Sequence, residues 1–195
     1  MSVLVEKAIA EAGLAEIARA RRSGDLERVR ALAPALQGAD LLALGGLADM
    51  IRAEEVGSVV RVYANAAAEG ADDVVVVRGA EGTLTLRKVA IARITGPRRA
   101  RVRLDWSDTG LELAQVALGF GASELVGPIA NRRGLPIADD VKTKVKGVGL
   151  VAVQALRRGE LEALIARAGR TVVFVDAAPE GRHPSPMPAE GPHAR

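Results

Sequence analysis

The clearest hydrophobic pattern of the chain lies between residues 106 and 129. Two apolar stripes at helical spacing run side by side there: Leu113, Val116, Ala117 and Phe120, and Leu111, Ala114 and Leu118. This pattern predicts a helix that is buried on more than one side. Thr109 and Glu112 have capping-box spacing at its start, and Gly121 is placed to end it in a left-handed conformation. A strand-like run over residues 101–105 precedes the helix, so the stretch predicts one βα unit of an α/β protein.

The same patterns divide the rest of the chain into helices and strands. They predict helices over residues 2–21, 26–36, 41–56, 83–94 and 161–168, with a further helix beginning at residue 151. They predict strands over residues 59–63, 74–77 and 171–175. Gly45 and Gly46 lie inside a predicted helix, where each costs ~1 kcal/mol relative to alanine. This favours close backbone packing against a neighbouring helix, with approach of a ligand as the alternative.

The 195 residues fit one folded domain with a terminal extension. We expect an N-terminal helical segment over residues 1–57 and an α/β domain over residues 58–176. Residues 177–195 are rich in proline and glycine, which predicts a disordered tail. Both histidines, His183 and His193, lie in that tail.

Composition narrows the chemistry of the folded part. Hydrophobic residues make up 49% of the chain and aromatic residues only 2%, which predicts an aliphatic core. The chain has no cysteine, so disulfides, thiolate metal sites and cysteine nucleophiles are excluded. With no histidine before the tail, a transition-metal site or a Ser-His dyad is disfavoured, and we expect no cofactor. No apolar run approaches the ~18 residues of a membrane span, and residues 1–20 do not read as a signal peptide, so we expect a cytoplasmic protein.

The segment GLELAQVALGFGASELVGPI, residues 110–129, resembles a known family. It is similar to the C-terminal end of the radical-SAM enzymes of menaquinone and deazaflavin-cofactor biosynthesis: aminofutalosine synthase, dehypoxanthine-futalosine cyclase and F-zero synthase. Segments 40–49, 86–94 and 160–176 resemble other elements of these enzymes, in the same order. The resemblance implies a partial (β/α) barrel of about four strands covered by helices. It also implies open sheet edges, which the N-terminal helices, a second copy or a full-length relative would cover.

The enzymes of this family hold a [4Fe–4S] cluster with three cysteines in a CxxxCxxC loop. Because this chain has no cysteine, the resemblance implies common shape without that activity. The first functional hypothesis is therefore a pseudoenzyme: a non-catalytic accessory or binding protein linked to menaquinone-type biosynthesis by the futalosine pathway.

Carboxylates are the remaining candidates for acid–base chemistry or ligand binding. Asp105 and Glu124 lie at the ends of the central βα unit, where α/β proteins place ligands. By the resemblance, Glu124 occupies the position of an acidic residue near the barrel mouth. The alternative for each is a helix cap or a surface salt bridge. Asp108 is explained as a charge near a helix N-terminus.

Two basic segments are candidate anion sites. Lys142, Lys144 and Lys146 alternate ahead of Gly147 and Gly149, and glycines beside lysines can form a backbone nest for phosphate. A solvated lysine face is the alternative. These residues support a second hypothesis, a small-molecule or phosphate-binding protein or enzyme that uses carboxylate and lysine side chains.

A second basic stripe lies on the strand predicted before the central helix. In a strand, Arg99, Arg101 and Arg103 point to one face, either as a basic stripe or as a solvated sheet edge blunted by charge. A nucleic-acid binder using Arg98–Arg103 and Lys142–Lys146 is the third hypothesis, which the low aromatic content disfavours.

The two apolar stripes of the central helix also predict an assembly. In a complete barrel this helix packs against a neighbour on each side, and here one neighbour is missing. We therefore expect a homodimer, or a complex with a full-length radical-SAM relative, with this helix near the contact. If the N-terminal helices cover the gap instead, the protein is a monomer.

Overall fold

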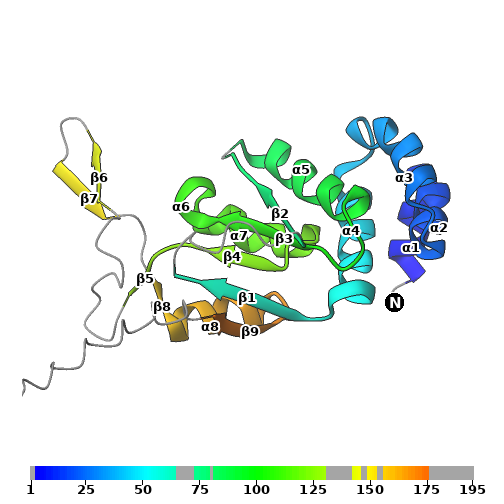
Figure 1. Ribbon diagram of the computed structural model, residues 1–195. Helices are drawn as coiled ribbons and strands as arrows, with labels where there is room; N and C mark the ends of the chain where they lie inside the picture. The colour runs from blue at the N-terminus through cyan, green and yellow to red at the C-terminus, as the bar shows by residue number, and fades with distance from the viewer. Residues whose placement is uncertain are drawn as a thin grey trace, which may run out of the picture.

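The computed structural model describes residues 3–64, 73–79, 81–130, 142–145, 149–152 and 156–175. The main sheet of this part is five-stranded and fully parallel, in the order β2-β3-β4-β1-β9 (Figure 1). Its strands are β1 (Val59–Tyr63), β2 (Val74–Val77), β3 (Arg101–Asp105), β4 (Glu124–Val126) and β9 (Thr171–Val175). The predicted α/β class is confirmed, with five strands rather than about four, and the sheet does not close into a barrel. β2, β3 and β4 follow one another as in a barrel, whereas β1 lies between β4 and β9.

Two further pairs of strands lie outside the main sheet. β5 (Ile129–Ala130) pairs in parallel with β8 (Leu156–Arg157), and β6 (Lys142–Val145) pairs antiparallel with β7 (Gly149–Ala152). The prediction of a helix beginning at residue 151 is wrong, because Val151 and Ala152 belong to β7. Pairing with β6 decides the conformation of these β-branched and small residues, which local pattern alone leaves ambiguous.

The N-terminal segment is a group of short helices that ends in one long helix. It contains α1 (Val3–Glu11), α2 (Ala15–Ser23), α3 (Leu26–Leu32), a 3-10 helix η1 (Ala33–Gln37) and α4 (Leu41–Val56). The single helix predicted over residues 2–21 is divided into two, because Gly13 adopts a positive φ of 73° and turns the chain. The helix starts predicted at residues 26 and 41 are confirmed, and Asp25 and Asp40 are their N-cap residues. Each carboxylate accepts a hydrogen bond from a backbone N–H three residues later, at 2.9 and 2.8 Å.

The helices of the α/β part are α5 (Gly82–Thr95), α6 (Trp106–Thr109), α7 (Leu111–Ala117), a 3-10 helix η2 (Leu118–Phe120) and α8 (Arg158–Arg167). The capping box predicted for Thr109 and Glu112 is wrong. Gly110 is the N-cap of α7 with a φ of 78°, and the Thr109 hydroxyl donates instead to the Asp105 carbonyl at 2.9 Å. The predicted helix end is confirmed, since Gly121 is left-handed with a φ of 97°.

The two faces of the main sheet differ in character. Alternate side chains on one face are almost fully buried against the helices: Val60, Val62, Val102, Leu104 and Leu125. These residues join one cluster with α4, α5, α7 and α8, and the cluster is mainly aliphatic, as composition predicts. By strand alternation, the other face carries Arg61, Tyr63, Arg101, Arg103 and Glu124. The hydrophobic face therefore forms the core with the helices, whereas the polar face carries the charged side chains that are candidates for a functional site.

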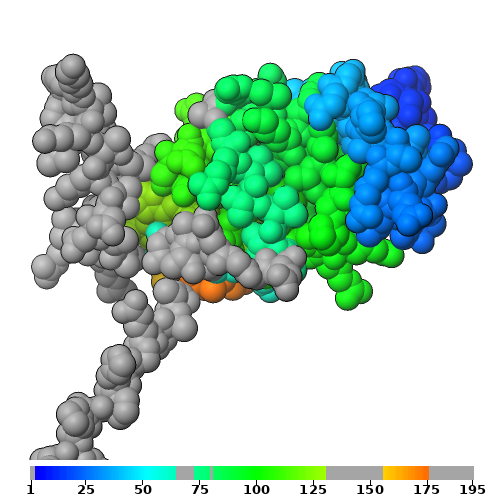
Figure 2. Space-filling model, turned by 45° about the horizontal axis from the view of Figure 1, so that its top comes forward, coloured from blue at the N-terminus to red at the C-terminus, as the bar shows by residue number. Residues whose placement is uncertain are grey.

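Helix α4 covers the flank of the central helix. A Cβ atom on Gly45 would lie 2.6 Å from the Phe120 ring, and one on Gly46 would lie 3.2 Å from Val5. The predicted close helix packing at these glycines is thus confirmed. Figure 1 shows α4 between the sheet and the first three helices, and Figure 2 shows those helices gathered at one end of the molecule. Ala114 and Leu118 are fully buried within the single chain, while Val116 is 51% exposed.

This cover was the alternative to a dimer, and it removes most of the apolar patch that motivated a contact between copies. The oligomeric state stays a prediction. In the described part of the chain, no helix is both long and apolar enough to cross a membrane. The predicted tail over residues 177–195 lies outside the described residues.

Candidate functional site

The polar face of the sheet is centred on Glu124. In the parallel register Glu124 lies opposite Arg61 of β1 on one side and Arg103 of β3 on the other. Its side chain has no exposed surface. Arg103 Nε donates to Glu124 Oε2 at 2.9 Å, Arg101 Nη1 lies 3.0 Å from Oε1, and the Tyr63 hydroxyl lies 3.3 Å from the same oxygen. We call Tyr63, Arg101, Arg103 and Glu124 the sheet cluster.

The sheet cluster satisfies a carboxylate that would otherwise be very unfavourable to bury. The Arg103 guanidinium also stacks 4.8 Å from the centre of the Tyr63 ring, so both partners are fixed in place. The interpretation of the arginine stripe as a solvated sheet edge is wrong, because β3 is an internal strand and the Arg103 side chain is only 4% exposed. The predicted alternation is confirmed for Arg101 and Arg103, which both reach Glu124.

Asp105, the other predicted carboxylate, lies at the carboxyl end of β3. Its Oδ1 accepts a hydrogen bond from the backbone N–H of Ser107 at 2.7 Å, so it caps the short helix α6. It lines a small hollow of about 60 Å³ together with Arg78, Arg103 and Asp108. Asp105 and Glu124 are thus held by separate sets of partners. Asp105 carries out the capping role that was the alternative to ligand binding.

The lysine segment is described only through its backbone strands. Lys144 lies in β6 opposite Leu150, and Gly149 lies in β7 opposite Val145. Lys146 and Gly147 lie outside the described residues. The phosphate nest predicted at these positions stays a prediction.

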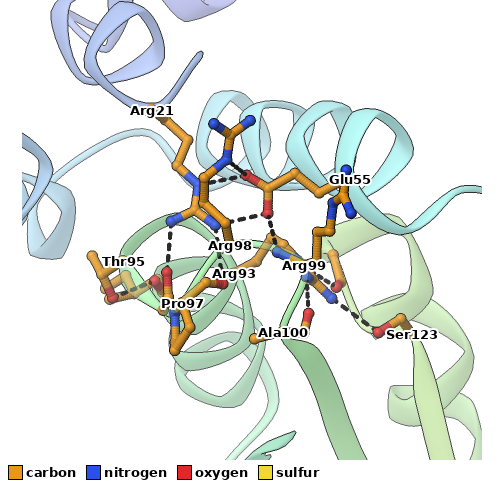
Figure 3. Close-up of polar contacts among 12 residues, drawn as sticks. Arg21, Glu55, Arg93, Thr95, Pro97, Arg98, Arg99, Ala100 and Ser123 are labelled. Atoms are coloured by element: carbon orange, nitrogen blue, oxygen red, sulfur yellow. Dashed lines mark hydrogen bonds and ion pairs between the residues drawn. The ribbon is translucent and has the colours of Figure 1, made fainter. Parts of the chain in front are cut away.

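The turn between α5 and β3 is held by a second buried carboxylate, Glu55 of α4 (Figure 3). Arg21 Nε donates to Glu55 Oε1 at 2.9 Å, and Arg21 Nη2 donates to Glu55 Oε2 at 2.8 Å. The two side chains thus form a bidentate ion pair. The backbone N–H of Arg99 donates to Glu55 Oε2 at 3.0 Å, and Arg21 also donates to the Gly96 carbonyl at 2.6 Å. We call Arg21, Glu55, Gly96 and Arg99 the turn cluster.

Arg93 fixes the other side of the same turn. Its guanidinium is buried and donates to the Ala100 carbonyl, to the Gly121 carbonyl at 2.9 Å and to Ser123 Oγ at 2.9 Å. Ser123 Oγ accepts in addition from the backbone N–H of Val102 at 3.1 Å. Burial lowers the pKa of Arg93 to about 10, so the side chain is still a cation at neutral pH. The start of β3 is therefore tied both to α5 and to the start of β4.

A hollow of about 350 Å³ opens at this amino end of the sheet. Its charged lining consists of Arg61, Arg99, Arg101 and Asp73, and two valines, Val56 and Val59, supply an apolar side. We call it the arginine hollow. Arg101 Nη2 lies 2.6 and 2.8 Å from the two carboxylate oxygens of Asp73. These hydrogen bonds lower the pKa of the Asp73 carboxyl below its ordinary value.

Sequence reasoning missed most of this hollow. Arg61 stands between valines in a strand, and a charged residue at the middle of a central strand is a signal that it lines a polar face. Glu55 and Asp73 gave no comparable signal, because their partners Arg21 and Arg101 lie 34 and 28 residues away.

The residues of this chain do not fit the iron–sulfur cluster that the family resemblance would imply, since such a cluster needs thiolates and the chain has no cysteine. Within the described residues, no group of three or more potential metal ligands occurs. Comparison of the sequence with models of known protein families and with curated proteins gives no match. The relationship to the radical-SAM enzymes accordingly remains an expectation.

Proposed function

We propose that this protein is a non-catalytic binding or accessory protein connected with menaquinone-type biosynthesis. The resemblance of residues 110–129 to the radical-SAM enzymes supplies the connection. The lack of cysteine argues against the chemistry of those enzymes. The parallel sheet with helices packed on one face is compatible with descent from part of a barrel.

The engagement of Glu124 is the observation that carries the non-catalytic part of the proposal. A general acid or base must come within hydrogen-bond distance of the proton that it transfers. Glu124 has no exposed surface and is paired with Arg101 and Arg103. Glu55 is only 6% exposed and is paired with Arg21. The most buried acidic groups thus serve the fold, which favours binding over catalysis.

Anaerobic reconstitution with iron and sulfide tests this proposal. We expect the protein to stay colourless and to release no 5′-deoxyadenosine from S-adenosylmethionine, because it has no thiolate to hold a cluster. A stoichiometric cluster absorbance with formation of 5′-deoxyadenosine would overturn the proposal.

The accessory role also predicts association with a second copy or with a full-length relative. Light scattering of the protein alone, and of its mixture with a purified aminofutalosine synthase, measures both. A homodimer or a complex of fixed stoichiometry supports the accessory role. A monomer in both experiments restricts the proposal to the binding of a small ligand.

A second candidate is a small-molecule-binding protein outside that biosynthesis. The arginine hollow favours it, because it is a concave site with positive charge and an apolar side. The same reconstitution does not separate the two candidates, whereas association with aminofutalosine synthase does.

A further inference from the structure

Among the described residues, the lining of the arginine hollow carries more positive than negative charge. Three arginines and one aspartate line it. Arg101 is shared between Asp73 and Glu124, at 2.6 and 3.0 Å. The side chains of Arg61 and Arg99 form no ion pair with any other residue that the structure describes. An excess of two guanidinium groups in a concave site favours an anion there.

The backbone at Arg99 is held in an uncommon conformation. Arg99 has a φ of 61°, the only positive φ among the non-glycine residues that the structure describes. This left-handed conformation is unfavourable for a residue other than glycine. The hydrogen bond from its N–H to Glu55 and the contacts of Arg21 with the preceding carbonyls hold the turn in place. The turn cluster therefore fixes an arginine at the rim of the hollow before any ligand arrives.

The shape and lining of the hollow limit the kind of ligand. A volume of about 350 Å³ suits a small metabolite. The planar guanidinium groups match two oxygens of one phosphate, and the valines at positions 56 and 59 can cover an apolar part of the same molecule. With an aromatic content of only 2%, the chain offers little surface for stacking the bases of a single-stranded nucleic acid.

We infer that the arginine hollow binds the phosphate group of a small phosphorylated molecule through Arg61, Arg99 and Arg101. The inference rests on the proposed function, since it names the class of ligand that a non-catalytic binding protein would take. This site lies at the amino end of the sheet, and its described lining includes neither Lys142 nor Lys144 of the predicted lysine segment.

Calorimetric titration of the full chain with pyrophosphate tests the inference. We expect saturable binding that weakens by roughly tenfold or more in Arg61→Gln and in Arg99→Gln, because each removes a charge-assisted hydrogen bond. Arg30→Gln is the matched control, since Arg30 is an exposed arginine on α3 away from the hollow. It should leave binding unchanged.

Arg99→Gly separates a loss of ligand contact from a loss of folding. Glycine relieves the positive φ, so the thermal midpoint should stay equal or rise while pyrophosphate binding falls. A stable Arg99→Gly variant that binds as the wild type does would overturn the role of Arg99.

Three other results would overturn the inference: no binding of pyrophosphate, equal binding by the Arg61→Gln, Arg99→Gln double variant, or equally tight binding of malonate, which would point to a carboxylate ligand. If the protein bound duplex DNA more tightly than pyrophosphate at physiological salt, and the same variants lost this binding, the ligand of the hollow would be a nucleic acid rather than a small molecule.

The two experiments distinguish a failure of the phosphate-binding inference from a failure of the proposed function. Formation of an iron–sulfur cluster would remove the proposed function and leave the pyrophosphate titration standing. Absence of pyrophosphate binding by a colourless protein would remove only the arginine hollow.

Discussion

Glu124 and Glu55 are both buried carboxylates held by arginine side chains, but their partners come from different parts of the chain. Glu124 pairs with Arg101 and Arg103 of the neighbouring strand, so the whole sheet cluster lies on one face of the sheet. Glu55 pairs with Arg21 of α2 and with the backbone of Arg99 in the α5–β3 turn. The first carboxylate joins strands, whereas the second joins an N-terminal helix to a turn.

The two clusters also treat their arginines differently. In the sheet cluster the Arg103 side chain is 4% exposed, and its positive charge is paired with the buried Glu124 carboxylate. Beside the turn cluster, Arg98 Nε lies 3.8 Å from Glu55 Oε1 with its side chain 54% exposed, and Arg99 of the turn cluster lines the arginine hollow. The sheet cluster stabilises the fold. The turn cluster holds the backbone of the α5–β3 turn, so that the Arg99 side chain can contact a ligand in the arginine hollow. The arginine hollow beside the turn is therefore the stronger candidate for ligand binding, because the arginines that line it outnumber the carboxylates in its described lining.

Glu124→Gln should give the largest effect on stability. It leaves two arginines in a buried site without their shared negative charge, and removing one partner of a buried pair typically costs ~3–5 kcal/mol. The free energy of unfolding in urea measures the loss. Glu162→Gln, at an exposed position of α8, should change it by less than ~0.5 kcal/mol.

A second variant sharpens this prediction. Combining Glu124→Gln with Arg103→Met removes a charge of each sign and should recover part of the loss. If Glu124→Gln cost no more than the exposed Glu162→Gln, the sheet cluster would not be a buried ion pair.

Glu55→Gln should cost less, about 1–3 kcal/mol, because a neutral side chain can still accept hydrogen bonds from Arg21 or from the Arg99 backbone. Arg21 also keeps its hydrogen bonds to the Gly96 and Pro97 carbonyls. The matched control is the adjacent Glu54→Gln, which breaks only the half-exposed pair with Arg22 at 3.4 Å and should cost at most ~1 kcal/mol. Equal losses in the two variants would show that Glu55 does not organise the turn.

Much of the fold follows from local pattern. Helix starts at Asp25 and Asp40 are carried by the capping residue itself, and four of the five strands of the main sheet have enough residues to show a strand pattern. The fifth, β4, has only three residues, and so short a run shows no period from which a strand could be predicted. The order of the strands could not be predicted from local pattern either, because β1 pairs with β4 and β9, which are far from it in the sequence.

The candidate site was predicted only in its parts. The alternation of β3 places Arg101 and Arg103 on one face, yet nothing local indicates that Glu124 lies between β1 and β3 and accepts from both arginines. The separate roles of Asp105 and Glu124 have the same origin. Asp105 is followed by its own partner Ser107, whereas the partners of Glu124 lie on two other strands, β1 and β3. Ion pairs between distant elements depend on strand order, which the sequence did not supply.

Substitution of Asp73 should give the smallest effect, because Asp73 is an exposed partner of Arg101 that lies outside the sheet cluster. Arg101 pairs with the fully buried Glu124 on one side and with Asp73, whose side chain is 58% exposed, on the other. Hydrogen bonding to Arg101 lowers the pKa of Asp73 from 3.8, so its stabilising contribution is present above pH 3.8 and is lost as the pH falls through the lower folded-state value.

Asp73→Asn should therefore lower the thermal midpoint slightly at neutral pH, and the difference from the wild type should shrink as the pH falls below 3.8. High salt should shrink it as well, since the pair is exposed. Thermal melts of both proteins across this pH range measure the effect, with Glu162→Gln as an exposed carboxylate control. A difference that grows with acid would contradict the pairing with Arg101, because a carboxylate stabilised in its charged form loses its contribution when it is protonated.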